Sequence, residues 1–196
     1  MSAKPRLILG SSSPRRKIIL EQLHLPPDII EGADINEDVL PKELPAAYCK
    51  RIARAKCEAL APKFPNDFII TADTTCAVGR RILVKPEDIK DAGRMLRLLS
   101  GRTHRILTAV CVRAPDGRIA QRLSDNRVKV KRLSDDELND YLATREWEGK
   151  AGGYHFRGPF IRYVVRISGS DTGILGLPAF ETTQMLLGLG YIPTCT

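Results

Sequence analysis

The first strand-like segment of the chain runs directly into a polar turn that opens a helix. The apolar run L-I-L at residues 7–9 leads through Gly10 into S-S-S-P-R-R at residues 11–16. Ser13 suits the N-cap of the following helix, and Pro14 suits its first turn. Four residues are placed to form its apolar face: Ile18, Ile19, Leu20 and Leu23. The segment predicts a strand, a turn and a helix in succession, the repeating unit of α/β folds.

The same turn has the composition of an anion-binding site. Free backbone N–H groups at a helix N-terminus, three serine hydroxyls and the guanidinium groups of Arg15 and Arg16 would converge there, as binding of a phosphate chain requires. An ordinary capped helix with arginines at its surface fits the local pattern equally well, because capped helices are far commoner than phosphate sites. The local sequence leaves both interpretations open.

Composition narrows the class of protein. With 196 residues, 43% of them hydrophobic, the chain can build the core of one domain or of two small lobes, and we expect a single domain spanning residues 1–196. No apolar run approaches the roughly 18 residues of a membrane span, and the start lacks the apolar segment of a signal peptide, so we expect a cytoplasmic protein. The net charge of +8 fits a nucleic acid or a small polyanion such as a nucleoside triphosphate, but no aromatic residues interleave the basic clusters.

The five cysteines form neither a metal-binding nor a disulfide pattern. Their number is odd, they are scattered, and no C-x-x-C pair occurs. Cys76 and Cys111 lie in apolar, strand-like runs, which predicts core packing. Cys49 and Cys57 lie eight residues apart on one predicted helix, and Cys195 lies near the end of the chain. The pattern assigns none of them a function.

Hydrophobic periodicity and turn residues divide the rest of the chain into alternating elements. Strands are predicted at residues 28–32, 68–72, 103–113, 118–133 and 162–168, with a small hairpin at residues 76–84. Helices are predicted at residues 46–61, 87–99, 134–144 and 179–189. An acidic loop falls at residues 33–45, and glycine-rich loops fall at 149–154 and 169–178. In this order Asp73 ends a strand, at the edge where α/β sheets bind ligands.

Three common catalytic patterns do not fit the sequence. Lys150 lacks the upstream glycine and the following hydroxyl residue of a P-loop. No G-x-S-x-G motif of a serine hydrolase occurs. His24, His104 and His155 are isolated from one another and from any H-E-x-x-H spacing, so we interpret each as a surface or packing residue.

What remains is a set of cationic and hydroxyl groups together with two carboxylates, Glu37 and Asp73. The candidates for phosphate binding are Ser11, Arg15, Arg16, Lys56, Lys85 and Lys150. Cleavage of a phosphoanhydride needs cations that hold the triphosphate and a carboxylate that positions Mg²⁺ or deprotonates water. The alternative interpretation of Asp73 is a carboxylate that only ends a strand.

Six motifs resemble, in order, those of the Maf family. They are S-S-S-P-R-R at residues 11–16, A-D-T at 72–74, L-V-K-P at 83–86, L-S-G-R-T-H at 99–104, K-A-G-G-Y at 150–154 and G-L-P at 176–178. One such motif alone is weak, whereas six in order over nearly the whole chain make coincidence implausible. The resemblance implies a twisted mixed α/β fold with two lobes around a nucleotide cleft, similar to the inosine triphosphate pyrophosphatases.

The resemblance also implies an activity. Maf proteins are nucleoside triphosphate pyrophosphatases, which release pyrophosphate, leave the monophosphate and use a divalent metal such as Mg²⁺ or Mn²⁺. Carried over to this chain, the residues that hold the phosphates are Ser11, Arg15, Arg16, Lys56 and Lys85. The same carry-over makes Asp73 the proton acceptor, and we expect Glu37 and Asp73 to bind the metal.

Three positions bear on the choice of base. Arg15 and Thr74 resemble the branch of the family that acts on dTTP and UTP, and not the branch with S-P-W-R and S-D-Q that prefers 7-methyl-GTP. Where the pyrimidine branch reads Y-G-I-Q-G, this chain reads Y-H-F-R-G, so Arg157 replaces a glutamine. Arginine offers only hydrogen-bond donors, whereas a glutamine amide offers a donor and an acceptor. Asn36 likewise replaces one of two adjacent acidic residues and leaves Glu37 as the remaining metal ligand.

The sequence thus predicts a metal-dependent, house-cleaning pyrophosphatase for dTTP, UTP or modified pyrimidine nucleotides. Two alternatives stay open: a pyrophosphatase that prefers 7-methyl-GTP, and a nucleotide-sensing or nucleic-acid-binding regulator on the same scaffold. The expected partner is a nucleoside triphosphate. We expect neither a membrane nor a nucleic acid as partner, and a homodimer stays open.

Overall fold

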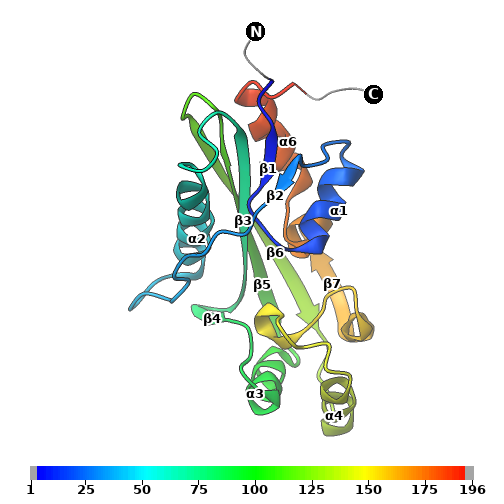
Figure 1. The fold of residues 1–196 in the computed structure, drawn as a ribbon. Coiled ribbons are helices and arrows are strands. Elements are labelled where there is room, and N and C mark those ends of the chain that lie inside the picture. The colour runs from blue at the N-terminus through cyan, green and yellow to red at the C-terminus, as the bar shows by residue number, and fades with distance from the viewer. Residues whose placement is uncertain (1–3, 193–196) are drawn as a thin grey trace.

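The structure, a computed structural model, describes residues 4–192, and its centre is a seven-stranded mixed sheet (Figure 1). The strands are β1 (Leu7–Leu9), β2 (Ile29–Ile30), β3 (Phe68–Val78), β4 (Arg81–Leu83), β5 (Thr103–Arg113), β6 (Ile119–Val130) and β7 (Val164–Ser168). Hydrogen-bonded neighbours follow the order β2-β1-β3-β5-β6-β7, and β4 pairs with β3 outside that path. β1 runs parallel to β2 and β3, and all other pairs are antiparallel. The expected mixed α/β fold is confirmed.

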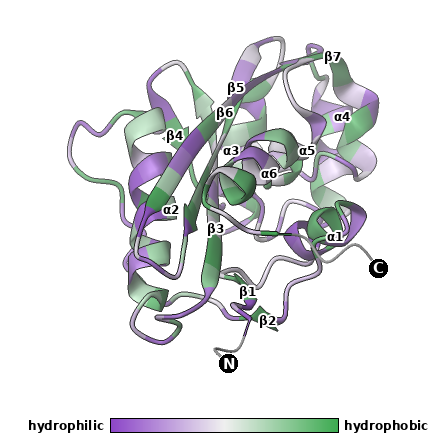
Figure 2. Ribbon diagram, turned by 90° about the horizontal axis from the view of Figure 1, so that it is seen from above, coloured by the Kyte–Doolittle hydropathy of each residue, from purple (hydrophilic) through white to green (hydrophobic). Residues whose placement is uncertain are grey.

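Helices cover both faces of this sheet. They are α1 (Pro14–Gln22), α2 (Pro45–Leu60), α3 (Ile89–Leu99), α4 (Asp135–Ala143), α5 (Asp171–Leu175) and α6 (Ala179–Gly188), with 3-10 helices η1 (Ala151–Gly153) and η2 (Pro159–Tyr163). In Figure 1, α2 lies on one side of the sheet, α1 and α6 lie on the other, and α3 and α4 lie at the lower end. Figure 2 shows green and purple residues on the same helix in α2 and α6, as expected where a helix buries one side. None of the helices in residues 4–192 is long and apolar enough to span a bilayer.

The strand β3 organises the packing because its alternate residues face opposite sides of the sheet. Ile69 belongs to the apolar cluster under α2, and Thr71 Oγ1 donates to Ala53 O of that helix at 2.7 Å. Ile70 belongs to the cluster that holds α1 and α6. Cys76, farther along the strand, packs in a third cluster with α3 and α4. Three apolar clusters therefore surround the middle of β3.

Pairing along one edge of β3 is interrupted. β1 pairs with β3 only as far as Ile70, and β4 begins its pairing at Cys76. The chain leaves β1 at Gly10, whose N–H donates to Ile70 O at 2.7 Å. A Cβ at this position would lie 2.5 Å from Thr71 Cγ2, so the close approach requires glycine. The interval at residues 71–75 is left without a β1 or β4 partner, and the candidate site forms there.

Most expected elements are confirmed to within a few residues, but the expected end of the strand at Asp73 is wrong. β3 continues to Val78, because β5 pairs with it from Ile69 to Ala77. Asp73 therefore lies in the middle of a long strand, at its unpaired edge, and not at a carboxyl end. The site still lies at the predicted residues, because the gap between β1 and β4 along this edge of β3 exposes Asp73 and its neighbours.

Two local expectations are also wrong, and one lies outside the described residues. The segment 169–178 contains the short helix α5, in addition to turns. In α1, Ser13 is the N-cap and Pro14 begins the helix, as expected, although the Ser13 side chain makes no capping bond. The expected apolar face is wrong in part, because Ile18 is half exposed and the fully buried residues are Ile19 and Leu20. Cys76 and Cys111 are buried as expected, and Cys195 lies outside residues 4–192.

Candidate active site

The interval at the edge of β3 opens into a cavity of about 680 Å³, a usual size for a small-molecule site. Its walls come from segments far apart in the chain: the turn after β1, the loop before α2, α2 itself, β3, β4, the segment around η1 and the end of α5. Eight residues predicted from the sequence line it: Ser11, Arg15, Arg16, Glu37, Lys56, Asp73, Thr74 and Lys85. Lys150 lines it as well.

A lysine joins the two candidate carboxylates. Lys56 Nζ lies 2.8 Å from Glu37 Oε1 and 3.2 Å from Asp73 Oδ1. The side chains of Lys56 and Asp73 are only 12% and 10% exposed, so water screens this pair poorly. Thr75 Oγ1 donates to Asp73 Oδ2 at 3.1 Å. Both oxygens of the Asp73 carboxylate therefore have a protein partner, and each keeps lone-pair capacity for one more hydrogen bond.

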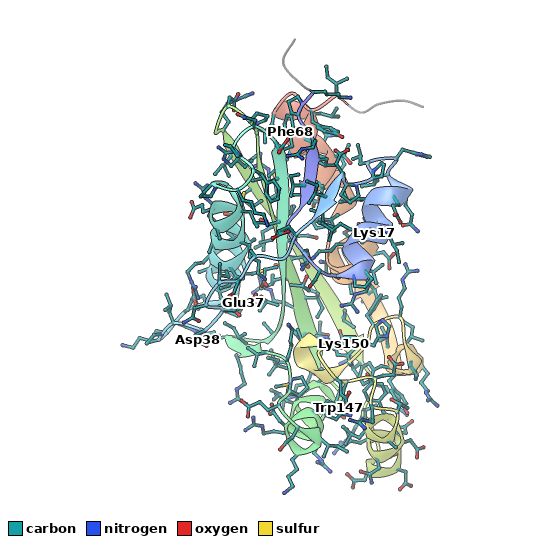
Figure 3. The ribbon with its side chains drawn as sticks, in the orientation of Figure 1. Lys17, Glu37, Asp38, Phe68, Trp147 and Lys150 are labelled. Atoms are coloured by element: carbon teal, nitrogen blue, oxygen red, sulfur yellow. The ribbon has the colours of Figure 1, made fainter. Side chains whose placement is uncertain are left out.

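The helix α2 brings these groups together. It carries Lys56 on the side that faces β3, and two turns earlier Tyr48 donates its hydroxyl to Glu37 O at 2.9 Å. Arg51 of the same helix pairs with Glu43 at 2.7 Å, which fixes the end of the acidic loop. In Figure 3, Glu37 accordingly lies beside α2, while Lys150 comes from the segment after α4, far away in the sequence.

Cys49, to which the sequence assigned no function, also lies on this side of α2. Its thiol contacts Asp73 O at 3.3 Å and Leu107 O at 3.4 Å, and Ala109 N–H donates to the sulfur at 3.2 Å. Burial, and then the nearby charge of Asp73, raises the pKa of the Cys49 thiol to about 12. The thiol stays neutral and keeps its proton for donation.

Arg16 links three walls of the cavity. Its Nε donates to Gly176 O at 2.8 Å, one terminal nitrogen donates to Ser11 Oγ at 2.8 Å, and the other reaches Thr74 Oγ1 at 3.4 Å. Burial lowers the pKa of the Arg16 guanidinium, and the charge of Asp73 opposes that shift. Arginine still carries its charge at physiological pH, and two of its five N–H groups remain free for a ligand.

Two further cations face the cavity without a protein partner. Among residues 4–192, no ion pair or side-chain hydrogen bond involves Arg15 or Lys85, although both line the cavity. Burial lowers the pKa of Arg15, and no carboxylate compensates it. At the start of α1, Pro14 has no N–H and the Arg16 N–H donates to Ser13 O at 3.2 Å, so within residues 4–192 the Arg15 N–H is the first-turn donor left without an acceptor. The cavity therefore presents unneutralised positive charge beside the group of Lys56, Glu37 and Asp73, which we call the Lys56 centre.

The opposite wall comes from the glycine-rich segment 149–154, which the sequence marked as a functional loop. Gly152 has a φ of 74°, and a Cβ there would lie 2.6 Å from Cys76 Sγ, so the segment closes tightly on β3. Tyr154 lines the cavity, and its hydroxyl lies 2.7 Å from Nε2 of the buried His104. His104 is thus a packing residue, as expected. His155, expected at the surface or in packing, lines the cavity and lies 3.0 Å from Glu146.

Arg157 is the one predicted site residue that does not line the cavity. Its guanidinium forms an ion pair with Asp171 in the first turn of α5, and both side chains are more than half exposed. The preceding residues, His155 and Phe156, do reach the cavity. The lining side chains that the sequence did not single out include Tyr48 and Phe156, and helical or strand periodicity marks such residues only as core candidates.

The carboxylates of Glu37 and Asp73 could share a divalent cation, but they supply only two protein ligands. No group of three or more His, Cys, Asp or Glu side chains able to hold a metal occurs among residues 4–192. Glu37 and Asp73 nevertheless both lie within hydrogen-bonding reach of one ammonium group, so their oxygens converge. Mg²⁺ in nucleotide sites is usually held by one or two carboxylates together with substrate phosphates and water. The donor set therefore suits a metal that arrives with its nucleotide.

The chain is similar in sequence to several known proteins. A "dTTP/UTP pyrophosphatase" of Cereibacter sphaeroides is 52% identical, covering 94% of this chain and 95% of that one. Proteins with the same name from Rhodopseudomonas palustris and Caulobacter vibrioides are 47% and 46% identical, covering 97% and 98% of this chain and 95% and 100% of theirs. A crystal structure of a "Nucleoside-triphosphatase / dITP/XTP pyrophosphatase" from Mycobacterium abscessus aligns with a TM-score of 0.41 at 14% identity, over 65% of this chain and 73% of that one.

The family follows from the sequence match together with the motifs. The family model described as Maf-like protein matches residues 6–189, nearly the whole chain. Five of the six motifs that carry the resemblance contribute at least one residue to the cavity wall. The sixth, at residues 99–104, contributes His104, which contacts the wall residue Tyr154 from behind. The chain therefore belongs to the Maf family.

Proposed function

We propose that this protein is a metal-dependent nucleoside triphosphate pyrophosphatase that acts on dTTP and UTP in the cytoplasm. It hydrolyses the bond between the α- and β-phosphates and leaves the monophosphate and pyrophosphate. The observation that carries the proposal is the Lys56 centre, which joins Asp73 and Glu37 beside the unpaired cations of one cavity. The names of the relatives support the same activity and the same bases.

The phosphate chain would bind along the cationic wall. Arg15 and Lys85 have free charge, Arg16 has two free N–H groups, and Ser11 Oγ lies beside Arg16 at 2.8 Å. The N-terminus of α1 adds the backbone N–H of Arg15 and the positive end of the helix dipole. Charge-assisted hydrogen bonds of this kind both position a triphosphate and stabilise charge that develops on the leaving pyrophosphate.

In this proposal Asp73 is the general base. Its carboxylate is held through both oxygens and still has room to accept a hydrogen bond from a water molecule. It takes the proton of that water as the oxygen attacks phosphorus. Lys56 holds the carboxylate in place through Oδ1, and its charge can be shared with a phosphate oxygen. A positioned general base contributes about 10²- to 10⁴-fold to the rate.

The metal would be held by Glu37 and Asp73 together with the phosphates. When bound, Mg²⁺ or Mn²⁺ would neutralise phosphate charge and polarise the phosphoryl oxygen. The loop of Glu37 is anchored through Tyr48, so this carboxylate is available on the outer side of Lys56. With only two protein carboxylates, we expect weak metal affinity without nucleotide and stronger affinity with it.

We assign recognition of the nucleobase to Arg15 and Thr74 at the cavity wall, with Arg157 acting from just outside it. Thr74 Oγ1 is fixed by Arg16 and by Thr108 Oγ1 at 3.0 Å, so its position is well defined. Arg157→Gln tests the contribution of Arg157. A changed ratio of UTP to dTTP turnover supports it, whereas an unchanged ratio removes Arg157 from the specificity set.

The experiment that tests the proposed function is pyrophosphate release from dTTP, UTP, CTP, GTP, 7-methyl-GTP and ITP with Mg²⁺ or Mn²⁺. We expect turnover of dTTP and UTP to exceed that of the purine nucleotides and to stop when the metal is chelated. Turnover of 7-methyl-GTP above the pyrimidines would overturn the base assignment. If no nucleotide of the panel releases pyrophosphate although nucleotides still bind, the result would contradict the proposed enzymatic activity and favour the nucleotide-sensing alternative.

A further inference from the structure

Asp73 is held by two residues that the proposed chemistry does not use. The first is Thr75, two residues along β3 and therefore on the same side of the strand. Thr75 is 2% exposed, and its hydroxyl donates to Asp73 Oδ2 at 3.1 Å. Lys56 occupies the other oxygen, Oδ1. With one partner on each oxygen, the carboxylate cannot rotate without losing a hydrogen bond to a charged group, which is among the stronger hydrogen bonds in proteins.

The second residue is Cys49, which fixes the main chain of Asp73. Its thiol lies 3.3 Å from Asp73 O on β3, and it accepts the N–H of Ala109 on β5 at 3.2 Å. Asp73 and Ala109 are cross-strand partners in the ladder. Cys49 precedes Lys56 by two helical turns on α2, so the same face of one helix carries both groups. The thiol thereby bridges α2 to Asp73 on β3 and to Leu107 and Ala109 on β5.

Neighbouring residues of the same types make no hydrogen bond to Asp73. Thr71 is a second fully buried threonine on the same side of β3, but its hydroxyl donates to Ala53 O of α2 at 2.7 Å. Cys57 is a second buried cysteine of α2, in the same apolar cluster as Cys49, but no hydrogen bond joins it to Asp73. A threonine or a cysteine buried between α2 and β3 therefore does not bond to Asp73 merely because it is buried there, and Thr71 and Cys57 serve as matched controls.

We infer that Thr75 and Cys49 are positioning residues for the proposed general base, Thr75 for the carboxylate and Cys49 for the main chain of Asp73. This inference rests on the proposed function. It assigns both residues to the chemical step and not to nucleotide binding, since neither one contributes a charge to the cationic wall. Their loss would change the orientation of Asp73 relative to Lys56 and leave the phosphate-binding groups where they are.

The test for Thr75 compares Thr75→Val, which removes the hydroxyl at nearly constant volume, with Thr75→Ser, which keeps it. With dTTP and Mg²⁺, we expect Thr75→Val to lower kcat about 10-fold with KM within about 2-fold of wild type. Thr75→Ser should restore most of kcat, and the matched control Thr71→Val should leave both constants unchanged. Wild-type kcat in Thr75→Val, or equal loss in Thr75→Ser, would overturn the inference.

The test for Cys49 compares Cys49→Ala with Cys57→Ala. Each removes one buried thiol from the same helix and cluster, so we expect both to lower the melting temperature. Only Cys49→Ala should also lower kcat. An equal effect of the two variants on kcat would reduce Cys49 to a packing residue and overturn its assignment.

A structural readout separates this inference from the proposed activity. In crystal structures of Thr75→Val and Cys49→Ala, we expect the Asp73 carboxylate to move away from Lys56 Nζ, while Thr71→Val and Cys57→Ala leave it in place. An unmoved carboxylate would overturn the inference even if the wild-type protein hydrolyses every nucleotide expected. A moved carboxylate would support it even if no nucleotide is hydrolysed. Should Thr75→Val fail to fold, Thr75→Ala against Thr75→Ser makes the same comparison.

Discussion

Gly10 connects the stability of the fold with the geometry of the site, and Gly10→Ala tests that connection. An added Cβ would lie 2.5 Å from Thr71 Cγ2, 2.7 Å from Leu60 Cδ1 and 3.2 Å from Ile70 O. The first two contacts are with side-chain ends, which can shift, whereas the third is with the backbone of β3. Overpacking of this kind costs about 1–3 kcal/mol, and the lower entropy of the unfolded alanine chain offsets about 0.4–1 kcal/mol of that.

We therefore expect Gly10→Ala to lower the free energy of unfolding by about 1–2 kcal/mol, or the melting temperature by about 2–8 °C in a chain of this size. The turn of residues 11–13 should move away from β3, which would raise KM for the nucleotide. The assay is denaturant unfolding of Gly10→Ala, with Gly32→Ala as the matched control, because a Cβ at Gly32 meets no atom within 4 Å.

A double-mutant cycle identifies the contact responsible. Thr71→Ser removes Cγ2 and keeps the hydroxyl that donates to Ala53 O. In that background, Gly10→Ala should cost less by about 0.5–1 kcal/mol, since the closest clash is gone. An equal cost in both backgrounds, or a Gly10→Ala variant as stable as Gly32→Ala, would refute the argument that the close approach at Gly10 requires glycine.

Two further predictions concern buried ionisable groups. Lys56→Met leaves the carboxylate of Asp73 without its cation, so we expect a loss of about 2–3 kcal/mol in the free energy of unfolding, measured with urea, together with loss of turnover. Unchanged stability would contradict the pairing. Burial lowers the pKa of His104 to about 4 from its usual 6.5, so the unfolded chain takes up the proton first as the pH falls. Stability should therefore decline from pH 6.5 to pH 4, and His104→Gln should decline less steeply; equal slopes would show that His104 is not the cause.

Local signals predicted most of the fold; one failure has a tertiary cause, and another is a local signal that was missed. The hairpin of β5 and β6 and the capping box of α4, where Ser134 and Glu137 exchange hydrogen bonds, follow from turn and cap residues. The length of β3 could not be predicted, because the polar residues after Ala72 suggest a strand end unless their partners on α2 are known. The helix α5 was missed although its signals are present: Ser170 accepts the N–H of Gly173, and Gly176 ends the helix with a φ of 112°.

The charged part of the site was predicted, and its neutral supports were not. Residue type alone indicated Lys56 and Asp73, since phosphates need cations and hydrolysis needs a carboxylate. Cys49 acts on Asp73, 24 positions away, and on Ala109, 60 positions away, so no local spacing could reveal it. Arg157 was expected at the base, but its ion pair with Asp171 holds it outside the cavity, and the charge of a residue does not tell which partner it will meet.

The measurement that tests the account most directly is product analysis of dTTP hydrolysis by the wild-type protein and by Asp73→Asn. Asparagine nearly preserves the shape of the side chain but cannot accept a proton from water at neutral pH. We predict that the wild-type protein forms dTMP and pyrophosphate in equal amounts, and that Asp73→Asn binds dTTP but turns it over at least about 100-fold more slowly. Near-normal turnover by Asp73→Asn, or formation of dTDP and phosphate, would contradict the assignment of Asp73 and of the bond that is cleaved.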